Sequence, residues 1–153
     1  MSRFHGWLFL LAVAACLGGC GPKLPPGARP TKKVTVTVLY KGAPVENANV
    51  TFVNQEGEAA PANGRTGPDG KAKLKTYTEE DGAVLGQHKV LIEKSESVGG
   101  SNIPQDSPEY NPNAPPPTIK YLLPKKYSDY ANSGLTAEVK DSGPNEFTFD
   151  LKD

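Results

Sequence analysis

The two cysteines of the chain, Cys16 and Cys20, are the residues whose type and spacing first suggest chemistry. Thiols this close could form a disulfide or bind a metal ion. A disulfide between them would close a very small loop, which would constrain little of the unfolded chain. A structural zinc site needs four ligands, and no second pair of cysteines or histidines follows downstream to complete one. Neither pairing therefore accounts for these two cysteines.

Both cysteines lie at the end of a hydrophobic leader. Residues 1–6 carry Arg3, residues 7–17 are uncharged and mostly apolar, and small residues follow. This order of a positively charged region, an apolar region and small residues is typical of a secretory signal peptide. The apolar run is shorter than the roughly 20 residues that a stable transmembrane helix requires. We therefore expect residues 1–19 to be a signal peptide that is removed from the mature chain.

Residues 17–20, LGGC, resemble the bacterial lipobox, in which an aliphatic residue and two small residues precede a cysteine. In such precursors the peptide is cut just before the cysteine, whose thiol and new amine are acylated. Residues 13–16, VAAC, fit the same short pattern, so both sites stay open. We favour lipidation at Cys20, because cleavage at Cys16 would shorten the apolar region and leave a second thiol nearby. Several acyl chains would satisfy the requirement that stable anchoring needs more than one lipid signal.

Few other residues suggest chemistry once this leader is removed. His88 would be the only histidine of the mature chain, and it lies in a predicted strand, where packing is a commoner role than catalysis. Glu79, Glu80 and Asp81 share a loop and could contribute to a weak Ca²⁺ site, but they lack EF-hand spacing and adjacent acids are usually just solvated. We therefore expect no catalytic residue, no metal site and no cofactor, and a protein that is not an enzyme.

Two further sets of residues have simple structural interpretations beside a functional one. Tyr121, Tyr127 and Tyr130 could form an aromatic binding patch, although packing of their segment back against the fold is the simpler interpretation. Lys32 and Asn145 share faces with core positions of the first and last predicted strands, which leaves a Lys–Asn isopeptide bond as a covalent alternative. The sequence identifies no ligand for either set.

The composition excludes some classes of partner. The 153 residues include 17 basic and 17 acidic side chains, so no basic field indicates nucleic acid and no acidic field indicates a basic partner. This length corresponds to one domain. The 16 glycines and 15 prolines favour turns and short strands over helices.

Short strands are the elements that must position these residues. From residue 32 the hydrophobic period changes to two, and Val34, Val36 and Val38 share one face. The same pattern predicts further strands at 48–53, 71–77, 86–94, 135–140 and 147–151. In the strand at 71–77, the alternating lysines predict a solvated outer face.

The remaining segments are predicted to be loops, turns and a tether. Residues 20–31, which begin with the lipidated cysteine, are rich in proline and glycine and read as a tether, ahead of a domain over 32–153. Residues 98–118 are a proline-rich insert that cannot supply a core. Residues 121–130 predict an edge strand broken at a proline, then a turn or short helix. The segment DSGPNE, residues 141–146, is predicted to be a hairpin loop between the last two strands.

Strands of this kind without a convincing amphipathic helix indicate an all-β fold, either a β-sandwich or a small barrel. The one-sided apolar faces favour the sandwich, in which two sheets share a thin core. The predicted core consists of Val34, Val36, Val38, Val50, Phe52, Leu74, Val90, Ile92, Leu135, Val139, Phe147, Phe149 and Leu151.

Three segments together resemble the carboxypeptidase regulatory-like domain: VTVTVLYKGAPVENANVTFVN, GRTGPDGKAKLKT and GAVLGQHKVLIEK. The positions that match its pattern are Gly42, Pro44, Val45, Ala48, Val50, Thr66, Asp69, Gly70, Gly86, His88 and Val90. His88 stands where an aromatic residue is usual. The tail, residues 121–152, is similar to the end of bacterial lipoproteins built from this one domain. The resemblance implies a seven-stranded, prealbumin-like (transthyretin-like) Greek-key β-sandwich.

Enzymes that share this sandwich use residues that this chain lacks. The hydroxyisourate hydrolases rely on histidines, an arginine and a C-terminal motif, whereas this chain ends in DLKD. The intradiol dioxygenases hold iron with two tyrosines and two histidines, which a single mature histidine cannot match. The resemblance therefore implies a binding or structural module.

These observations predict a lipoprotein anchored to a membrane of the bacterial cell envelope, facing the periplasm or the cell surface. Its partners would be the membrane, through the anchor at Cys20, and an envelope protein or glycan, with no role for nucleic acid. Two alternatives stay open. One is an assembly subunit of an envelope transport or secretion system, and the other is a sandwich that binds a small molecule or Ca²⁺.

Overall fold

The computed structural model of the protein describes residues 24–99, 106–113 and 115–153. Cys16 and Cys20, and with them the predicted signal peptide and lipidation site, lie outside the described residues. The described chain is all-β, with one short 3-10 helix, η1 (Lys125–Ser128). In chain order the strands are β1 (Thr31–Lys32), β2 (Val34–Tyr40), β3 (Ala43–Pro44), β4 (Asn49–Asn54), β5 (Ala62–Arg65), β6 (Lys71–Lys73), β7 (Ala83–Val84), β8 (Gly86–Glu93), β9 (Ser95–Val98), β10 (Thr118–Tyr121), β11 (Leu135–Val139) and β12 (Asn145–Leu151).

The first of two larger sheets has the strand order β11-β8-β4-β5, and all its pairs are antiparallel. Strand β8 lies in its interior and pairs with β4 from Asn49↔Glu93 to Asn54↔His88. Side chains of β8 alternate between the two faces, so that Val90 and Ile92 are buried while Lys89 and Leu91 are only half-buried. This sheet therefore has one core face and one solvated face.

The second sheet is built around β2. Strand β12 pairs with β2 in parallel, from Asn145↔Val34 to Leu151↔Tyr40. The other edge of β2 pairs with β6 and, further along, with β3. Two parallel neighbours cannot be joined by a tight turn, and β2 and β12 are accordingly far apart in the sequence, near the two ends of the domain. The first long strand, β2, and the last strand, β12, are thus hydrogen-bonded neighbours in this sheet.

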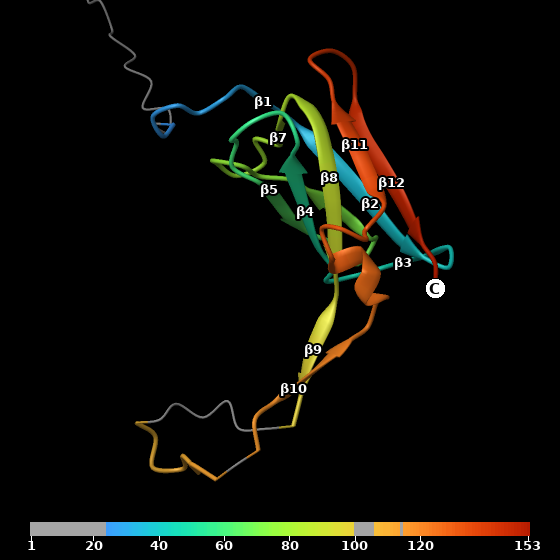
Figure 1. Cartoon of the computed structure of the whole chain (residues 1–153). Helices are drawn as coiled ribbons and strands as arrows, with labels where there is room; N and C mark the ends of the chain where they lie inside the picture. Colours follow the sequence, from blue (N-terminus) through green and yellow to red (C-terminus); the bar gives the residue numbers. More distant parts are fainter. Residues whose placement is uncertain (1–23, 100–105, 114) are drawn as a thin grey trace, which may run out of the picture.

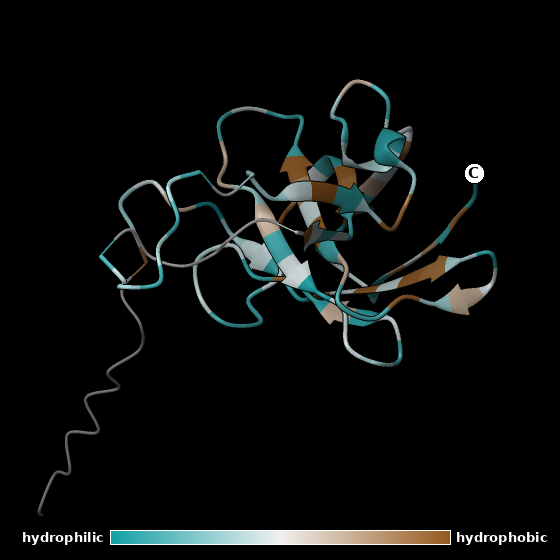
Figure 2. Ribbon diagram, turned by 90° about the horizontal axis from the view of Figure 1, so that it is seen from below, coloured by the Kyte–Doolittle hydropathy of each residue, from teal (hydrophilic) through white to brown (hydrophobic). Residues whose placement is uncertain are grey.

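The two sheets enclose a common core, and the fold is β-sandwich-like (Figure 1). Phe52 of β4 is fully buried in this core, and its ring centroid is 5.8 Å from that of Phe147 and 6.5 Å from that of Phe149 on β12. All predicted core residues are buried except Leu135, Phe147 and Phe149, which are partly buried and pack against the core. Figure 2 shows hydrophobic positions within the strands and mostly hydrophilic loops around them.

The hairpin predicted for residues 141–146 is wrong. Strand β11 pairs with β8 and β12 pairs with β2, so the connection crosses from one sheet to the other. The Asn145 side chain closes this crossing, because its Oδ1 accepts from the Lys140 N–H at 2.9 Å and its Nδ2 donates to the Lys140 carbonyl at 3.0 Å. The turn signal in the sequence was real, but the turn joins sheets rather than paired strands.

Two further predictions need smaller corrections. The strand expected at 71–77 ends earlier, at Lys73, and continues only as an isolated bridge between Asn63 and Lys75. The proline-rich insert is framed by regular structure, since its two ends belong to β9 and β10. The alternation of exposed lysines with buried Ala72 and Leu74 is confirmed.

Strands β9 and β10 form a two-stranded hairpin that we call the arm. Every residue of both strands is exposed, and they pair only with each other among the described strands. The arm continues β8 beyond the sandwich (Figure 1). The first described residues and the short pair β1–β7 lie at the other end of β8, as Figure 1 also shows. We call these the arm end and the tether end.

Helical structure in the described part of the chain is limited to η1. Nothing within those residues has the length and apolar character of a membrane-crossing helix.

Candidate functional site

A concavity of the arm end forms where the chain that continues β8 extends beyond the end of β2. Lys94 follows Ile92 at a spacing of two, so it continues the core face of β8, and its carbonyl accepts from the Leu122 N–H at 2.8 Å. The opposing layer stops at Tyr40, where the chain turns back through Lys41 and Gly42 with φ of 53° and 81°. Two successive positive φ values suit a tight hairpin turn. The core face is therefore uncovered from Lys94 onward.

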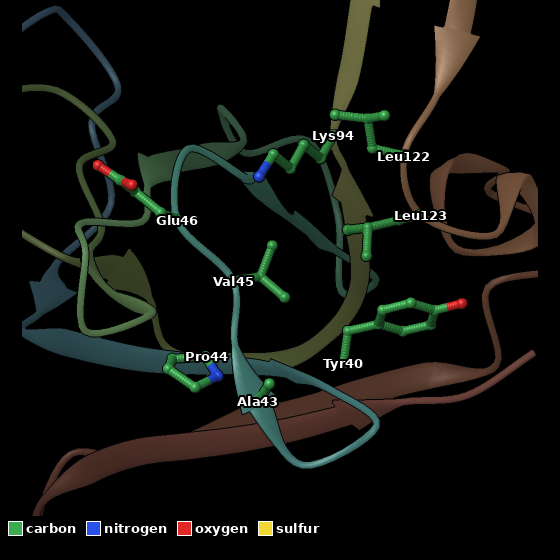
Figure 3. A pocket seen from close by; sticks show the side chains of 8 residues that line it. All are labelled: Tyr40, Ala43, Pro44, Val45, Glu46, Lys94, Leu122 and Leu123. Carbon is green, nitrogen blue, oxygen red and sulfur yellow. The ribbon is translucent and has the colours of Figure 1, made fainter.

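A pocket of about 290 Å³ lies at this step. It is lined by Tyr40, Ala43, Pro44, Val45, Glu46, Lys94, Leu122 and Leu123. In Figure 3 the Lys94 ammonium extends over Val45, whereas the Glu46 carboxylate points away from it. The Tyr40 ring faces the pocket and its hydroxyl points outward. The pocket is therefore lined by polar and apolar surface in similar amounts, with the Lys94 cation at its mouth.

The wall formed by Tyr40 is fixed by a polar cluster at the C-terminus. The Tyr40 hydroxyl bonds to the Asp153 carboxylate, and Lys41 forms an ion pair with the same carboxylate. The hydrogen bond from Lys41, followed by that from Tyr40, holds the pKa of Asp153 below its usual range. The Gly42 N–H donates to Asp150 Oδ1 at 3.0 Å. The turn that ends the opposing layer is thus held against β12.

The wall opposite Tyr40 is formed by Leu122 and Leu123, and Tyr127 holds the segment that carries them. The Tyr127 hydroxyl donates to the Lys152 carbonyl at 2.9 Å and accepts from the Lys152 N–H at 3.0 Å. Leu123 and Tyr127 are both buried in the core cluster. The expectation that this tyrosine segment packs back on the fold is confirmed for Tyr127. Tyr121 and Tyr130 remain 40% and 50% exposed, with Lys125 and Lys89 respectively over their rings.

The two charged residues that line the pocket are Lys94 and Glu46. Within residues 24–99, 106–113 and 115–153, neither Lys94 nor Glu46 takes part in an ion pair, whereas Lys41 and Lys120 do. A cavity whose lining includes Val45, Leu122 and Leu123 beside the Lys94 cation can bind a ligand that has an apolar part and an anionic group. Lys94 and Glu46 both line the pocket, but their side chains point in different directions.

His88 lies at the tether end and is buried. Its Nε2 is 2.7 Å from the Val84 carbonyl, which only accepts hydrogen bonds, so Nε2 carries the proton. Its Nδ1 is buried and has no hydrogen-bond partner among the residues that the structure describes. The centroid of the His88 ring lies 5.6 Å from that of Phe52. Burial lowers the pKa of His88. The packing interpretation of this histidine is therefore confirmed.

A polar network at the same end fastens the chain before β1. The Arg29 Nη1 donates to the Glu56 carbonyl at 2.8 Å and to Asn54 Oδ1 at 3.4 Å, and the Arg29 N–H donates to the Tyr77 hydroxyl at 3.2 Å. The Glu56 carboxylate in turn accepts from the Gln87 N–H at 3.2 Å. The predicted tether is thus attached to the sandwich at Arg29, two residues ahead of β1.

The acidic loop has a structural role. Asp81 Oδ1 accepts from the Thr76 N–H at 2.6 Å, and Oδ2 accepts from the N–H groups of Tyr77 and Thr78 at 2.9 and 3.0 Å. Glu79 pairs with Lys75 and Glu80 with Lys73. In the part of the chain that the structure describes, no group of three or more metal-ligating side chains comes together. Of the acids that suggested Ca²⁺, Asp81 therefore bonds within the loop, and Glu79 and Glu80 pair with lysines of the segment before it.

The isopeptide alternative is not supported by the contacts of its two residues. Lys32 Nζ lies 2.7 Å from Asp141 Oδ1. The side-chain amide of Asn145 is occupied by both backbone groups of Lys140. Each residue therefore has a different partner.

Sequence reasoning did not identify the pocket. Its walls come from a turn, from the end of β8 and from the segment after β10, which are far apart in the sequence. A signal was present in Lys94, because a lysine on the core face two residues after Ile92 marks where that face leaves the core.

No protein family, curated protein or solved structure matches this chain.

Proposed function

We propose that the protein is a lipid-anchored lipoprotein of the bacterial cell envelope whose β-sandwich is a non-catalytic binding module. The observation that carries the proposal is the sequence LGGC at residues 17–20, directly after an apolar run with a basic start. Acylation of Cys20 would then hold the domain at a membrane surface through the segment that ends at Arg29.

The positions of the two ends support a role in holding a binding surface out from the membrane. Arg29 is attached at the tether end of β8, and the arm and the pocket lie at its other end. Strand β8 runs from Gly86 to Glu93, which corresponds to roughly 25 Å at about 3.3 Å per residue. An anchor at residue 20 would place the arm end away from the lipid.

We also propose the finer fold, a prealbumin-like Greek-key sandwich of the carboxypeptidase regulatory-like kind. Its support is the position of the matching residues. Gly42 lies in the turn between β2 and β3, Gly70 precedes β6 with φ of 72°, and His88 is a core residue of β8. These are the structural roles that the resemblance implies for the three positions.

The test of the anchor is a pair of matched substitutions in the full-length precursor expressed in a bacterium. Cys20→Ser should abolish incorporation of labelled palmitate and move the protein from the detergent phase to the aqueous phase in Triton X-114 partition. Cys16→Ser should leave both readouts unchanged. The reverse result would place cleavage at Cys16, and no change with either variant would refute the anchor.

A further inference from the structure

We propose that the pocket at the base of the arm binds the C-terminal residue of an extended partner peptide. The apolar side chain of that residue would occupy the cavity, and its free carboxylate would pair with Lys94. The inference supplies the ligand class for the proposed binding module, but the pocket's chemistry does not depend on the lipid anchor.

The cavity has the size of an amino-acid side chain site rather than of a cofactor site. Its volume of about 290 Å³ is at or below the lower end of the range for small-molecule pockets, about 300 Å³. Val45 and Leu123 form a buried base, and Leu122, 37% exposed, forms one side. Filling this space with a leucine-like side chain would remove the remaining exposed apolar surface of these residues from water.

Lys94 determines the charge of the ligand. Its ammonium extends over Val45 at the pocket mouth, and it has no carboxylate partner among the described residues (Figure 3). Glu46 points in the other direction, so it does not neutralise the cation across the cavity. A carboxylate at the mouth would make a charge-assisted hydrogen bond to Nζ, which is stronger than a neutral one.

The small size of the site favours a C-terminal carboxylate over an acidic side chain. In an extended peptide, neighbouring side chains point to opposite faces, so an internal acid next to the apolar residue would point away from Lys94. An acid two residues away would be displaced by roughly 7 Å along the strand. A C-terminal apolar residue carries its carboxylate on the same Cα, and both groups therefore fit one small pocket.

The arm offers a path for the rest of the peptide. Its inner face continues from Lys94 through the cross-strand pairs Glu96↔Lys120 and Val98↔Thr118, and Lys120 Nζ lies 3.1 Å from Glu96 Oε1. This pair neutralises itself, so a peptide backbone can cross it without meeting a net charge. Because β2 ends at Tyr40, a peptide on this face would continue the layer of the second sheet.

The experiment measures binding of dye-labelled hexapeptides to the full chain in detergent micelles by fluorescence anisotropy. Three probes share the same serine- and threonine-rich sequence. The first ends in leucine with a free carboxylate, the second ends in leucine with an amide, and the third ends in serine with a free carboxylate. We expect saturable binding of the first probe and affinity about tenfold weaker for each of the others.

Two variants test the assignment of residues. Lys94→Gln should make the acid and amide probes bind equally, and Leu122→Ser should abolish the preference for leucine over serine. Lys89→Gln is the matched control, because Lys89 lies on β8, the strand that leads to Lys94, but on its opposite face. This substitution should leave all three affinities unchanged. Unchanged thermal unfolding midpoints would show that the variants are folded.

Absence of binding by the first probe overturns the proposal, and so does equal binding of the acid and amide probes to the natural chain. A preference for the acid that survives in Lys94→Gln would place the carboxylate elsewhere and also overturn it. These outcomes are separate from the fate of the lipoprotein proposal, which palmitate labelling decides.

Discussion

The two ends of the sandwich are built by different means. At the tether end, Arg29, Asp81 and His88 are engaged in polar networks, and they fix loops and the incoming chain to buried strands. At the arm end, the regular structure continues past the core, and both strands of the arm are exposed throughout. Polar contacts fasten both ends, including those of Tyr40 and Tyr127 at the arm end. The arm end differs in having an exposed two-stranded extension, at whose root Lys94 has no ion-pair partner among the described residues.

We therefore expect substitutions at the tether end to lower the stability of the fold more than substitutions at the arm end, which is the end available to a partner. Isolated two-stranded hairpins are only marginally stable in water, so the arm depends on its root at Lys94 and Leu122. Exposed strands with unpaired edges are also surfaces on which other chains pair. The following predictions compare substitutions at the two ends.

The largest difference is expected between two glycines. A Cβ at Gly82, φ 87°, would lie 1.7 Å from the Lys32 carbonyl oxygen, whereas a Cβ at Gly134, φ 65°, would meet nothing within 4 Å. Gly82→Ala should lower the free energy of unfolding by about 3 kcal/mol, from backbone strain and the separation of β1 from β7. Gly134→Ala should cost about 1 kcal/mol, from its left-handed backbone alone. Urea denaturation measures both, and equal losses would contradict the close approach.

A second comparison concerns two aspartates that each accept hydrogen bonds from their own loop. Asp81→Ala at the tether end should lower the free energy of unfolding by about 2 kcal/mol, because three part-buried N–H groups lose their acceptor. Asp129 at the arm end binds the N–H groups of Ala131 and Asn132 in solvent. Asp129→Ala should shift the urea midpoint by less than Asp81→Ala does, and a larger shift would reverse the assignment of the two ends.

The tether end should also respond to pH. Burial lowers the pKa of His88 from its ordinary value of 6.5, so the folded state favours the neutral ring. The contribution of the neutral His88 ring to the free energy of unfolding is therefore fully present above pH 6.5 and is lost as the pH falls through the lower pKa of the folded state. His88→Phe should flatten the stability profile between pH 7 and pH 5, measured by urea midpoints. A profile unchanged by the substitution would show that another group titrates in this range.

The smallest effect on global stability is expected for Arg29→Ala. A part-buried hydrogen bond to Asn54 and an exposed one to the Glu56 carbonyl would be lost, at a cost of about 1 kcal/mol. The local effect should be larger, since the chain before β1 would detach. Hydrogen exchange at residues 28–32 should accelerate, whereas exchange in the arm should stay as it is. Acceleration in both segments would mean that the two ends are not independent.

Much of the sandwich could be predicted from the alternation of β-branched and polar residues. Val34, Val36 and Val38 lie on the core face as expected, because strand burial follows a period of two wherever one face meets a core. His88 could be assigned to packing for the same reason. The pattern gives the face of each strand, but it does not give the strand's partner.

That limit explains the errors. DSGPNE has the composition of a hairpin loop. Its flanking strands do not pair with each other, however, because β11 pairs with β8 and β12 pairs with β2. The role of Asp81 was missed because backbone N–H groups, which leave no trace in the sequence, are its partners. The pocket could not be predicted because its lining comes from three segments that are distant in the sequence and that only the fold brings together.

The parallel pairing of β2 with β12 has a consequence for when the domain can form. Synthesis proceeds from the N-terminus, so β2 stays without this neighbour until residues 145–151 have been made. Contacts between residues so far apart in the sequence are slow to form in folding. Under the proposed export route, this delay would leave the second sheet open while the chain is still being moved across the membrane, and folding would be completed only by the last seven-residue strand on the far side.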